Sequence, residues 1–296
     1  MIENFNASKN SSGEFVDIKK YIGVASINIL AINPDNNKLR SYGWSIPEDA
    51  EEPKYLIINE DGKKSARIRF LVQIQDLEEK PIIALDFWAR PELQLNSDGT
   101  KCKIIDSYGR TAWATKSEVQ SHSIPQYANG PASISPDYKP CHSGEESLVL
   151  FLMKWLNMTP PQIMINGAWT ASTKPGRLTI DNWAKLFSGT KDSVDEIAGY
   201  VAAKADNRCK VILGVRKNDE NRSYQTFLPT CFLANGSPRD LNGNYPKAAR
   251  EIERYMNGRD ENSVIFSAAN VAEYKETATE VTDNSANTAE DGDLPF

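Results

Sequence analysis

Apolar and polar positions alternate clearly in the first half of the chain. Within residues 65–75 every second position is apolar, which is the period of a half-buried β-strand; these positions are Ala66, Ile68, Phe70, Val72 and Ile74. Residues 21–34 are rich in β-branched side chains and stop at an Asn-Pro pair, and residues 81–90 form another apolar run. Residues 101–115 predict a hairpin that turns at residues 107–109.

The pattern becomes helical after a proline-rich stretch. Residues 124–140 contain prolines at short intervals and predict a long loop. Helix-capping sequences that begin at Ser143 and Ser193 predict two helices, of which the first is apolar and extends to Met158. A short helix capped by Asp181 is predicted between them.

A hairpin and a closing helix follow. Residues 210–217 and 222–228 flank a polar turn and predict two paired strands. A helix is predicted at about 246–257, because a proline lies in its first turn and a glycine just past its end. After residue 270 the composition changes to Thr, Ala, Asn and acidic residues, which cannot form a core, so residues 271–296 are predicted to be disordered.

The order of these elements predicts a mainly β protein with inserted helices, of the α+β class. A helical block before the last two strands fits an OB-fold-like small barrel with a large helical insertion at about 117–205, although other small barrels and mixed sheets fit as well. The predicted domains are a flexible N-terminal arm (1–14), an elaborated OB-like domain (15–270) and the acidic tail. Residues 35–63 are predicted to be a surface connection.

The charge of the chain is unevenly distributed. The 34 basic and 40 acidic residues give a net charge of −6. Residues 271–296 contain seven acids and one base, which leaves 33 of each in the rest of the chain. The tail therefore carries the whole net charge, and the neutral body is compatible with a polyanionic partner if its bases share a face.

Catalytic and metal-binding patterns are weak. The chain has two histidines, His122 and His142, and it lacks a glycine-rich phosphate loop. Asp86 has no second acid of the kind that a nuclease metal site needs. The cysteines, which are better explained as buried free thiols than as zinc ligands, are Cys102, Cys141, Cys209 and Cys231. We therefore expect no cofactor and no metal.

The sequence also contains no pattern that predicts a transmembrane helix or a secretory signal. No window has the run of apolar residues that a transmembrane helix needs, and the first residues do not resemble a secretory signal. The scattered cysteines fit a reduced compartment. We therefore expect a cytoplasmic protein with no membrane partner.

The predicted strands combine cations with aromatic rings. Arg67 and Arg69 share one face of a strand, as do Lys101 and Lys103 in another. Proteins that bind single strands without sequence preference use cations along the phosphates and flat rings under the bases. The residues predicted to contact DNA are Arg67, Arg69, Trp88, Arg90, Lys101, Lys103, Tyr108, Arg110, Trp113, Arg216, Arg222 and Tyr224. Core packing is the alternative for each ring, and it is the favoured role of Trp155, Trp169 and Trp183.

The chain ends in Asp-Gly-Asp-Leu-Pro-Phe, after an acidic tract. This ending resembles the C-terminal tip of bacterial single-stranded DNA-binding proteins. The resemblance implies that the tip binds replication and recombination proteins, such as a polymerase, helicase, primase or nuclease. Phe296 would fill an apolar pocket while its carboxylate pairs with a base; the residues implied are Asp291, Asp293, Leu294, Pro295 and Phe296.

The body is more similar to single-stranded DNA-binding proteins of tailed, crAss-like bacteriophages. Three segments carry this resemblance: residues 23–28, residues 107–113 and the hairpin around 224–226. The resemblance implies a role in phage DNA replication, recombination and repair in the cytoplasm of the infected bacterial host. No residue can be matched to the tetramer interface of the bacterial family.

The function predicted from these features is non-enzymatic. The chain would coat single-stranded DNA and recruit enzymes through its C-terminal tip. One alternative is an enzyme of DNA metabolism, such as a nuclease or a strand-annealing recombinase, that carries a similar tail. Another is a structural or assembly protein whose tail is coincidental.

Overall fold

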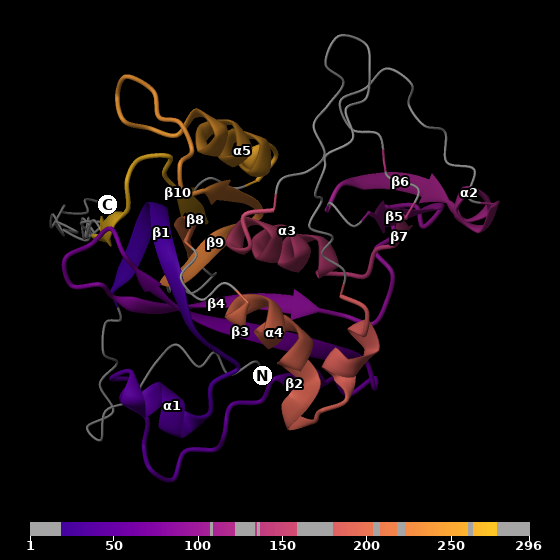
Figure 1. The fold of residues 1–296 in the computed structure, drawn as a ribbon, viewed down its shortest axis with the longest axis horizontal. Coiled ribbons are helices and arrows are strands. Elements are labelled where there is room, and N and C mark those ends of the chain that lie inside the picture. The colour runs from indigo at the N-terminus through magenta and orange to yellow at the C-terminus, as the bar shows by residue number, and fades with distance from the viewer. Residues whose placement is uncertain are drawn as a thin grey trace, which may run out of the picture.

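The structure is a computed structural model. It describes residues 19–106, 109–121, 134, 137–158, 180–203, 208–217, 223–259 and 263–276. Within these residues the protein is mainly β, with antiparallel sheets and helices packed between and around them (Figure 1).

The larger sheet is built around the long first strand. Its eight strands are β1 (Lys20–Ile32), β2 (Leu56–Ile58), β3 (Lys64–Ile74), β4 (Ile82–Ala89), β8 (Cys209–Lys217), β9 (Ser223–Ala234), β10 (Val264–Phe266) and β11 (Ala272–Tyr274). Strand β1 changes partners along its length. Residues 20–22 pair with β11, residues 23–27 with β8, and residues 27–32 with β3, all antiparallel. A register shift between Ile29 and Ala31 accompanies the pairing with β3.

The five longest strands follow one another across the sheet in the order β4-β3-β1-β8-β9. Phe87 of β4 lies with its ring centroid 5.0 Å from that of Phe227 and 6.1 Å from that of Phe232, both on β9. The two end strands therefore approach each other through their side chains. Among the described residues no backbone pairing joins them, so the sheet does not form a closed barrel.

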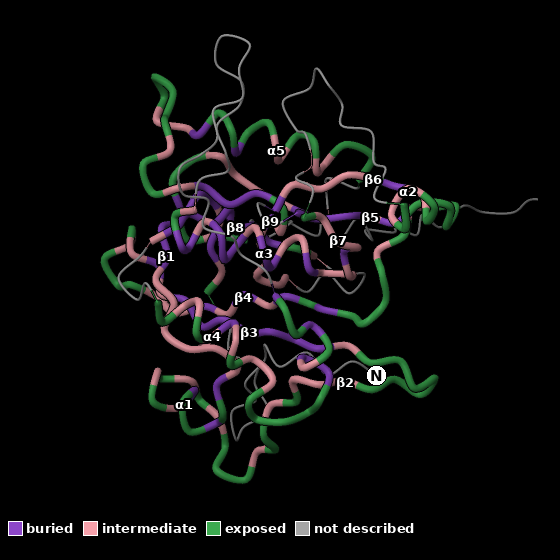
Figure 2. The backbone as a smooth tube through the Cα atoms, turned by 45° about the vertical axis from the view of Figure 1, so that its right-hand side comes forward, coloured by how far each residue is buried: buried purple, intermediate pink, exposed green. Residues whose placement is uncertain are grey.

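The core lies on the inner side of this sheet, where the helix α3 (Glu145–Trp155) packs. The ring of Phe151 on α3 lies 5.0 Å from Phe70 and Phe87 and 5.2 Å from Phe232, so one helix contacts strands from both ends of the sheet. Trp155 is fully buried, as expected from the sequence. Figure 2 shows that buried residues concentrate in the strands of the large sheet and in α3, whereas exposed residues predominate along α5 and in the loops.

A smaller sheet and several short helices complete the fold. The strands β5 (Lys101–Ile105), β6 (Thr111–Thr115) and β7 (Lys139–Pro140) form the second sheet in the order β6-β5-β7. The remaining elements are α1 (Asn36–Ser41), α2 (Lys116–Ser121), the 3₁₀ helices η1 (Trp183–Phe187) and η2 (Lys191–Val194), α4 (Asp195–Ala202) and α5 (Pro246–Met256). No helix among the described residues is long and apolar enough to cross a bilayer.

Most predicted elements are confirmed, including the hairpin of β5 and β6 and the helix that begins at Pro246. The predicted side-chain caps are wrong. Gly144 precedes α3 and Val194 precedes α4, so neither Ser143 nor Ser193 occupies the capping position. Asp181 does not cap either, because Asn182 precedes η1.

Two boundaries also need correction. The predicted surface connection at 35–63 contains α1 and β2. The tail predicted to be disordered from residue 271 begins with the strand β11, whose residues satisfy their backbone groups by pairing with β1.

Candidate nucleic-acid interface

The structure places the predicted DNA-binding residues in three groups. The first lies on β3 and β4, the second on the hairpin of β5 and β6, and the third where β8 pairs with β9. Tyr108, Arg222, Trp169 and the predicted partner-binding tip at 291–296 lie outside the described residues.

In the first group, Arg67 and Arg69 share a face of β3, as predicted, but both are buried. Arg69 is only 3% exposed, and its Nε and one terminal nitrogen donate to the two carboxylate oxygens of Asp86 at 2.7 and 2.6 Å. Burial by itself lowers the pKa of Arg69, but the hydrogen bonds and the charge of Asp86 outweigh it and raise the pKa. The expectation that Arg69 faces a phosphate is therefore not supported by its position.

Arg67 forms the centre of a stack. Its guanidinium lies over the ring of Tyr55, 5.4 Å from the centroid, and over the ring of Trp88, 5.9 Å from the centroid. Burial lowers the pKa of Arg67, and the neighbouring charge of Arg69 adds to this effect. Burial also raises the pKa of Tyr55 to about 12. The outer member of the stack, Trp88, remains 45% exposed.

The segment between β1 and β2 explains why the two arginines are buried. The side chain of Asn33 accepts a hydrogen bond from the backbone N–H of Arg69, and the carbonyl of Lys54 accepts one from the guanidinium of Arg67. The hydroxyl of Tyr55 donates to the carbonyl of Pro34 at 2.6 Å. The predicted surface connection therefore covers the outer face of β3 and leaves Trp88, on the neighbouring strand, at its margin.

Arg90 follows β4 and has an exposed side chain. Its backbone N–H donates to the carbonyl of Ser143, and its carbonyl accepts from the indole of Trp183 at 3.0 Å. Trp183 is 5% exposed, which confirms the core role expected for it. The backbone of Arg90 is thus fixed while its charge is open to solvent.

The second group centres on another exposed tryptophan. Trp113 on β6 is 43% exposed and lies directly opposite Lys103 on β5, whose amino group is 5.4 Å from the ring centroid. Lys103 also pairs with Glu146 of α3 at 2.5 Å, and Glu146 accepts a hydrogen bond from Thr111 at 3.0 Å. The lysine is therefore held beside the ring by the first turn of α3.

The other two basic side chains of the hairpin, Arg110 and Lys101, differ in their surroundings. Arg110 donates its Nε to the fully buried carboxylate of Asp106 at 2.7 Å, so it supports the turn. Lys101 is exposed and lies opposite Thr115. Of these two, Lys101 has the more accessible charge.

The third group contains Arg216 and Tyr224. These residues lie opposite each other on β8 and β9, at the end of the hairpin. Arg216 is exposed and Tyr224 is half-buried. A cation and a ring are again neighbours here.

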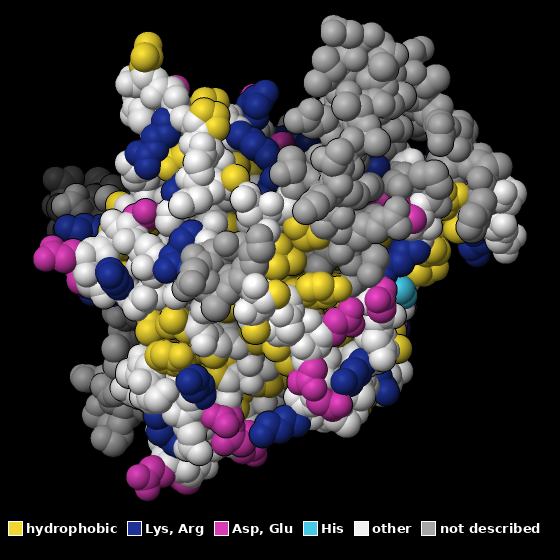
Figure 3. Space-filling model, in the orientation of Figure 1, with side chains coloured by type: hydrophobic (Ala, Val, Ile, Leu, Met, Phe, Trp, Pro, Cys, Tyr) yellow, Lys and Arg dark blue, Asp and Glu magenta, His cyan; other side chains and the backbone are white. Residues whose placement is uncertain are grey.

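Three basic residues that the sequence did not indicate line a cleft of about 540 Å³ beside Lys103. They are Lys154 of α3 and Lys247 and Arg254 of α5. On the face drawn in Figure 3, several Lys and Arg side chains lie at the top, over α5, while acidic side chains are more frequent toward the bottom. One signal in the sequence could have indicated two of them. Lys247 and Arg254 lie seven residues apart, which places them on one face of the predicted helix.

His142, one of the two histidines considered for catalysis, is part of a structural cluster around Glu145. The carboxylate of Glu145, which is fully buried, binds Lys139 at 2.8 Å and the imidazole Nδ1 of His142 at 3.0 Å. Burial by itself raises the pKa of Glu145, but the hydrogen bonds from His142 and Lys139 outweigh it and lower the pKa. The imidazole of His142 stacks on Trp183, with 5.5 Å between centroids. These contacts fix the start of α3.

The cysteines are buried free thiols, as predicted. Burial raises the pKa of Cys141 and of Cys209 to about 12. The described part of the chain contains no group of three or more His, Cys, Asp or Glu residues arranged to hold a metal ion.

The search for similar proteins gave no match. No protein-family model, no curated protein and no solved structure matches this chain.

Proposed function

We propose that the protein binds single-stranded DNA without sequence specificity. The observation that carries this proposal is the pair of exposed tryptophans, Trp88 and Trp113, each in contact with a cation. Trp is highly buried on average, so two rings that remain more than two-fifths exposed are candidates for contact with a ligand. A flat, anionic ligand would use both the ring and the cation.

Single-stranded DNA has both properties. Its bases are unstacked and can lie on an indole ring, which is worth about 1–3 kcal/mol per base, while cations attract its phosphates. In a duplex the bases are already stacked and paired, so the same rings have little to bind. Arg67 and Lys103 hold the rings of Trp88 and Trp113 in place and add positive charge beside them.

The order of the strands supports an OB-like interpretation of the fold. An OB-fold is a five-stranded, partly open barrel that binds oligonucleotides on the face of its second and third strands. Here the five longest strands are β1, β3, β4, β8 and β9 in chain order, and α3 lies before the last two. Arg67 lies on the second of these strands, β3, and Trp88 lies opposite it on the third, β4.

We extend the proposal to the setting that the resemblances imply. The protein would coat single-stranded DNA during phage replication, recombination and repair in the cytoplasm of the infected host. The C-terminal tip, ending in Phe296, would recruit partner enzymes. A nuclease has less support, because both oxygens of Asp86 bind Arg69 and are not arranged for a metal ion.

Fluorescence anisotropy with a labelled oligothymidine and a duplex of equal length tests the proposal. The wild-type protein should bind the single strand more tightly and with strong salt dependence. Trp88→Ala and Trp113→Ala should each weaken binding roughly 5- to 150-fold, from the stacking energy of one base. Leu241→Ala is the control, because Leu241 is a fully exposed apolar residue on the connection between β9 and α5, outside both tryptophan sites.

Two results would refute the proposal. One is equal affinity of the wild-type protein for single and double strands. The other is unchanged affinity in both tryptophan variants. Removal of residues 288–296 tests the tip separately, since it should abolish binding to partner enzymes and leave DNA affinity equal or slightly higher.

A further inference from the structure

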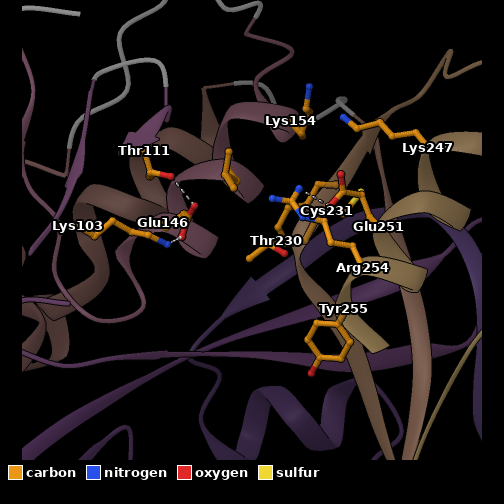
Figure 4. A pocket seen from close by; sticks show the side chains of 12 residues that line it. Lys103, Thr111, Glu146, Lys154, Thr230, Cys231, Lys247, Glu251, Arg254 and Tyr255 are labelled. Atoms are coloured by element: carbon orange, nitrogen blue, oxygen red, sulfur yellow. Dashed lines mark hydrogen bonds and ion pairs between the residues drawn. The ribbon is translucent and has the colours of Figure 1, made fainter. Parts of the chain in front are cut away.

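The cleft beside Lys103 is formed by faces of the helices α3 and α5, by the strand β9 and by the hairpin of β5 and β6. From α3, residues at four-residue intervals face it, namely Glu146, Leu150 and Lys154. From α5 it is lined by Lys247, Glu251, Arg254 and Tyr255, and β9 contributes Thr230, Cys231 and Phe232. Figure 4 shows Lys103, Thr111 and Glu146 on one side, the α5 residues on the other, and Lys154 between them.

The α5 side of the cleft is held in place by apolar packing. Ala248 is fully buried and Ile252 packs in the same cluster, together with Leu233 of β9. The ring of Tyr255 contacts Phe266 of β10, with 5.6 Å between centroids. The basic face of α5 is therefore fixed relative to β9 by the adjacent apolar face of the same helix.

The charges in the cleft are not balanced. Among the described residues that line it are four basic side chains, Lys103, Lys154, Lys247 and Arg254, and two carboxylates, Glu146 and Glu251. Glu146 binds Lys103 and Thr111, and Glu251 lies 3.7 Å from Arg254. In the part of the chain that the structure describes, no carboxylate pairs with Lys154 or with Lys247. These two lysines leave an uncompensated positive charge.

The positions of these two lysines disfavour the charged form of Lys154. Lys154 is half-buried, and in Figure 4 the side chain of Lys247 extends toward it. Burial lowers the pKa of Lys154, and the positive charge of Lys247 lowers it further. The negative charge of a bound anion would offset both effects and raise the pKa of Lys154, because it would supply the missing countercharge.

We infer that this cleft binds the phosphates of the single strand whose bases stack on the exposed tryptophans. The inference rests on the proposed function and adds the path of the backbone to it. Lys103 provides the continuity, because the same amino group lies over the ring of Trp113 and lines the cleft. When one base of the DNA strand stacks on Trp113, the next phosphates would contact Lys154 and Lys247.

Salt-dependent titration of the double variant Lys154→Gln/Lys247→Gln tests this inference. Affinity for oligothymidine is measured by anisotropy at several salt concentrations. Each phosphate contact on a single strand contributes about 0.7 to the slope of log K against log salt. Loss of two contacts should therefore make the slope shallower by about 1.4. The charge-matched control is Lys80→Gln/Lys191→Gln, since these exposed lysines lie outside the cleft; its slope should stay that of the wild-type protein.

Thermal unfolding without DNA provides a second measurement. The double variant should be as stable as the wild-type protein or more stable, because it removes two like charges that lack partners. The variant would then lose DNA affinity without losing stability. A structural role of the lysines predicts a lower unfolding temperature instead.

The outcomes separate the inference from the proposed function. If the wild-type protein fails to prefer single strands, both are wrong. If it prefers single strands but the cleft variant keeps the wild-type slope, only the inference is overturned, and an acidic segment of a partner protein becomes the better candidate for the cleft. A slope change of the same size in the control variant would also overturn it, because the effect would then be one of net charge.

Discussion

The buried ion pair of Arg69 and Asp86 gives the sharpest prediction about stability. Both carboxylate oxygens accept from the guanidinium, and the side chain of Arg69 is only 4% exposed. Asp86→Ala would leave the guanidinium buried without its partner. Such a change costs about 3–5 kcal/mol, and the low end is expected here because the side chain of Asp86 is 26% exposed and water can enter.

Urea denaturation measures this effect. For a chain of this size the unfolding free energy decreases by about 3 kcal/mol per molar urea, the upper end of the usual range. A loss of about 3 kcal/mol should therefore lower the urea midpoint by about 1 M. The control is Asp61→Ala. Asp61 pairs with Lys63 at a similar distance of 2.6 Å, but both side chains are more than half exposed, so the midpoint should stay unchanged.

The double variant Arg69→Met/Asp86→Leu extends the test to function. Replacing both charges with apolar residues should restore most of the lost stability, because no uncompensated charge remains. It should also keep the wild-type affinity for oligothymidine, since Arg69 does not face solvent. The reasoning fails if Asp86→Ala lowers the midpoint no more than Asp61→Ala, or if the stable double variant loses DNA binding.

Two further predictions concern the start of α3. In urea denaturation Gly144→Ala should destabilise the protein by about 1–3 kcal/mol more than Gly43→Ala. Both glycines have a positive φ, but at Gly144 the added Cβ would lie 1.8 Å from the carbonyl oxygen of Trp88, whereas at Gly43 it would meet no atom within 4 Å. Equal destabilisation by the two substitutions would contradict this. Glu145 has a lowered pKa in the folded protein, so its stabilising contribution is complete above its usual pKa of 4.5 and is lost as the pH falls through the folded value. Glu145→Gln should therefore lower the unfolding temperature at neutral pH. The unfolding temperature of the variant should also fall less between about pH 5 and 3, the range in which a carboxyl group titrates. If the unfolding temperatures of the variant and the wild-type protein fall in parallel, Glu145 does not have this role.

The strand β3 shows what the hydrophobic pattern could and could not reveal. The alternation within residues 65–75 predicted the strand and its inner face correctly. It did not reveal that the outer face is also covered. Leu71 was the signal, because it occupies the face of Arg67 and Arg69 and is fully buried. A leucine in the middle of a supposedly solvated face indicates that another segment packs there.

The sequence predicted the members of the candidate site better than their arrangement. Trp88 and Trp113 were predicted to lie on strands that carry cations, but the register between neighbouring strands places Trp88 opposite Arg67 and Trp113 opposite Lys103. The cleft arises from two helices far apart in the sequence that converge over β9. Neither Lys154 nor Lys247 is unusual on its own helix, and their lack of partners depends on tertiary packing.

The pairing of β1 with β11 has a consequence for how the protein folds during its synthesis. Lys20 lies opposite Tyr274, and β1 also needs β8 for its central residues. The first strand to leave the ribosome therefore waits for partners made much later, and contacts of such long sequence separation form slowly. Until then residues 20–27 of β1 lack their partner strands, and other chains could join this unpaired edge. We expect efficient production to depend on chaperones or on slow synthesis at low temperature, more than on the stability of the finished fold.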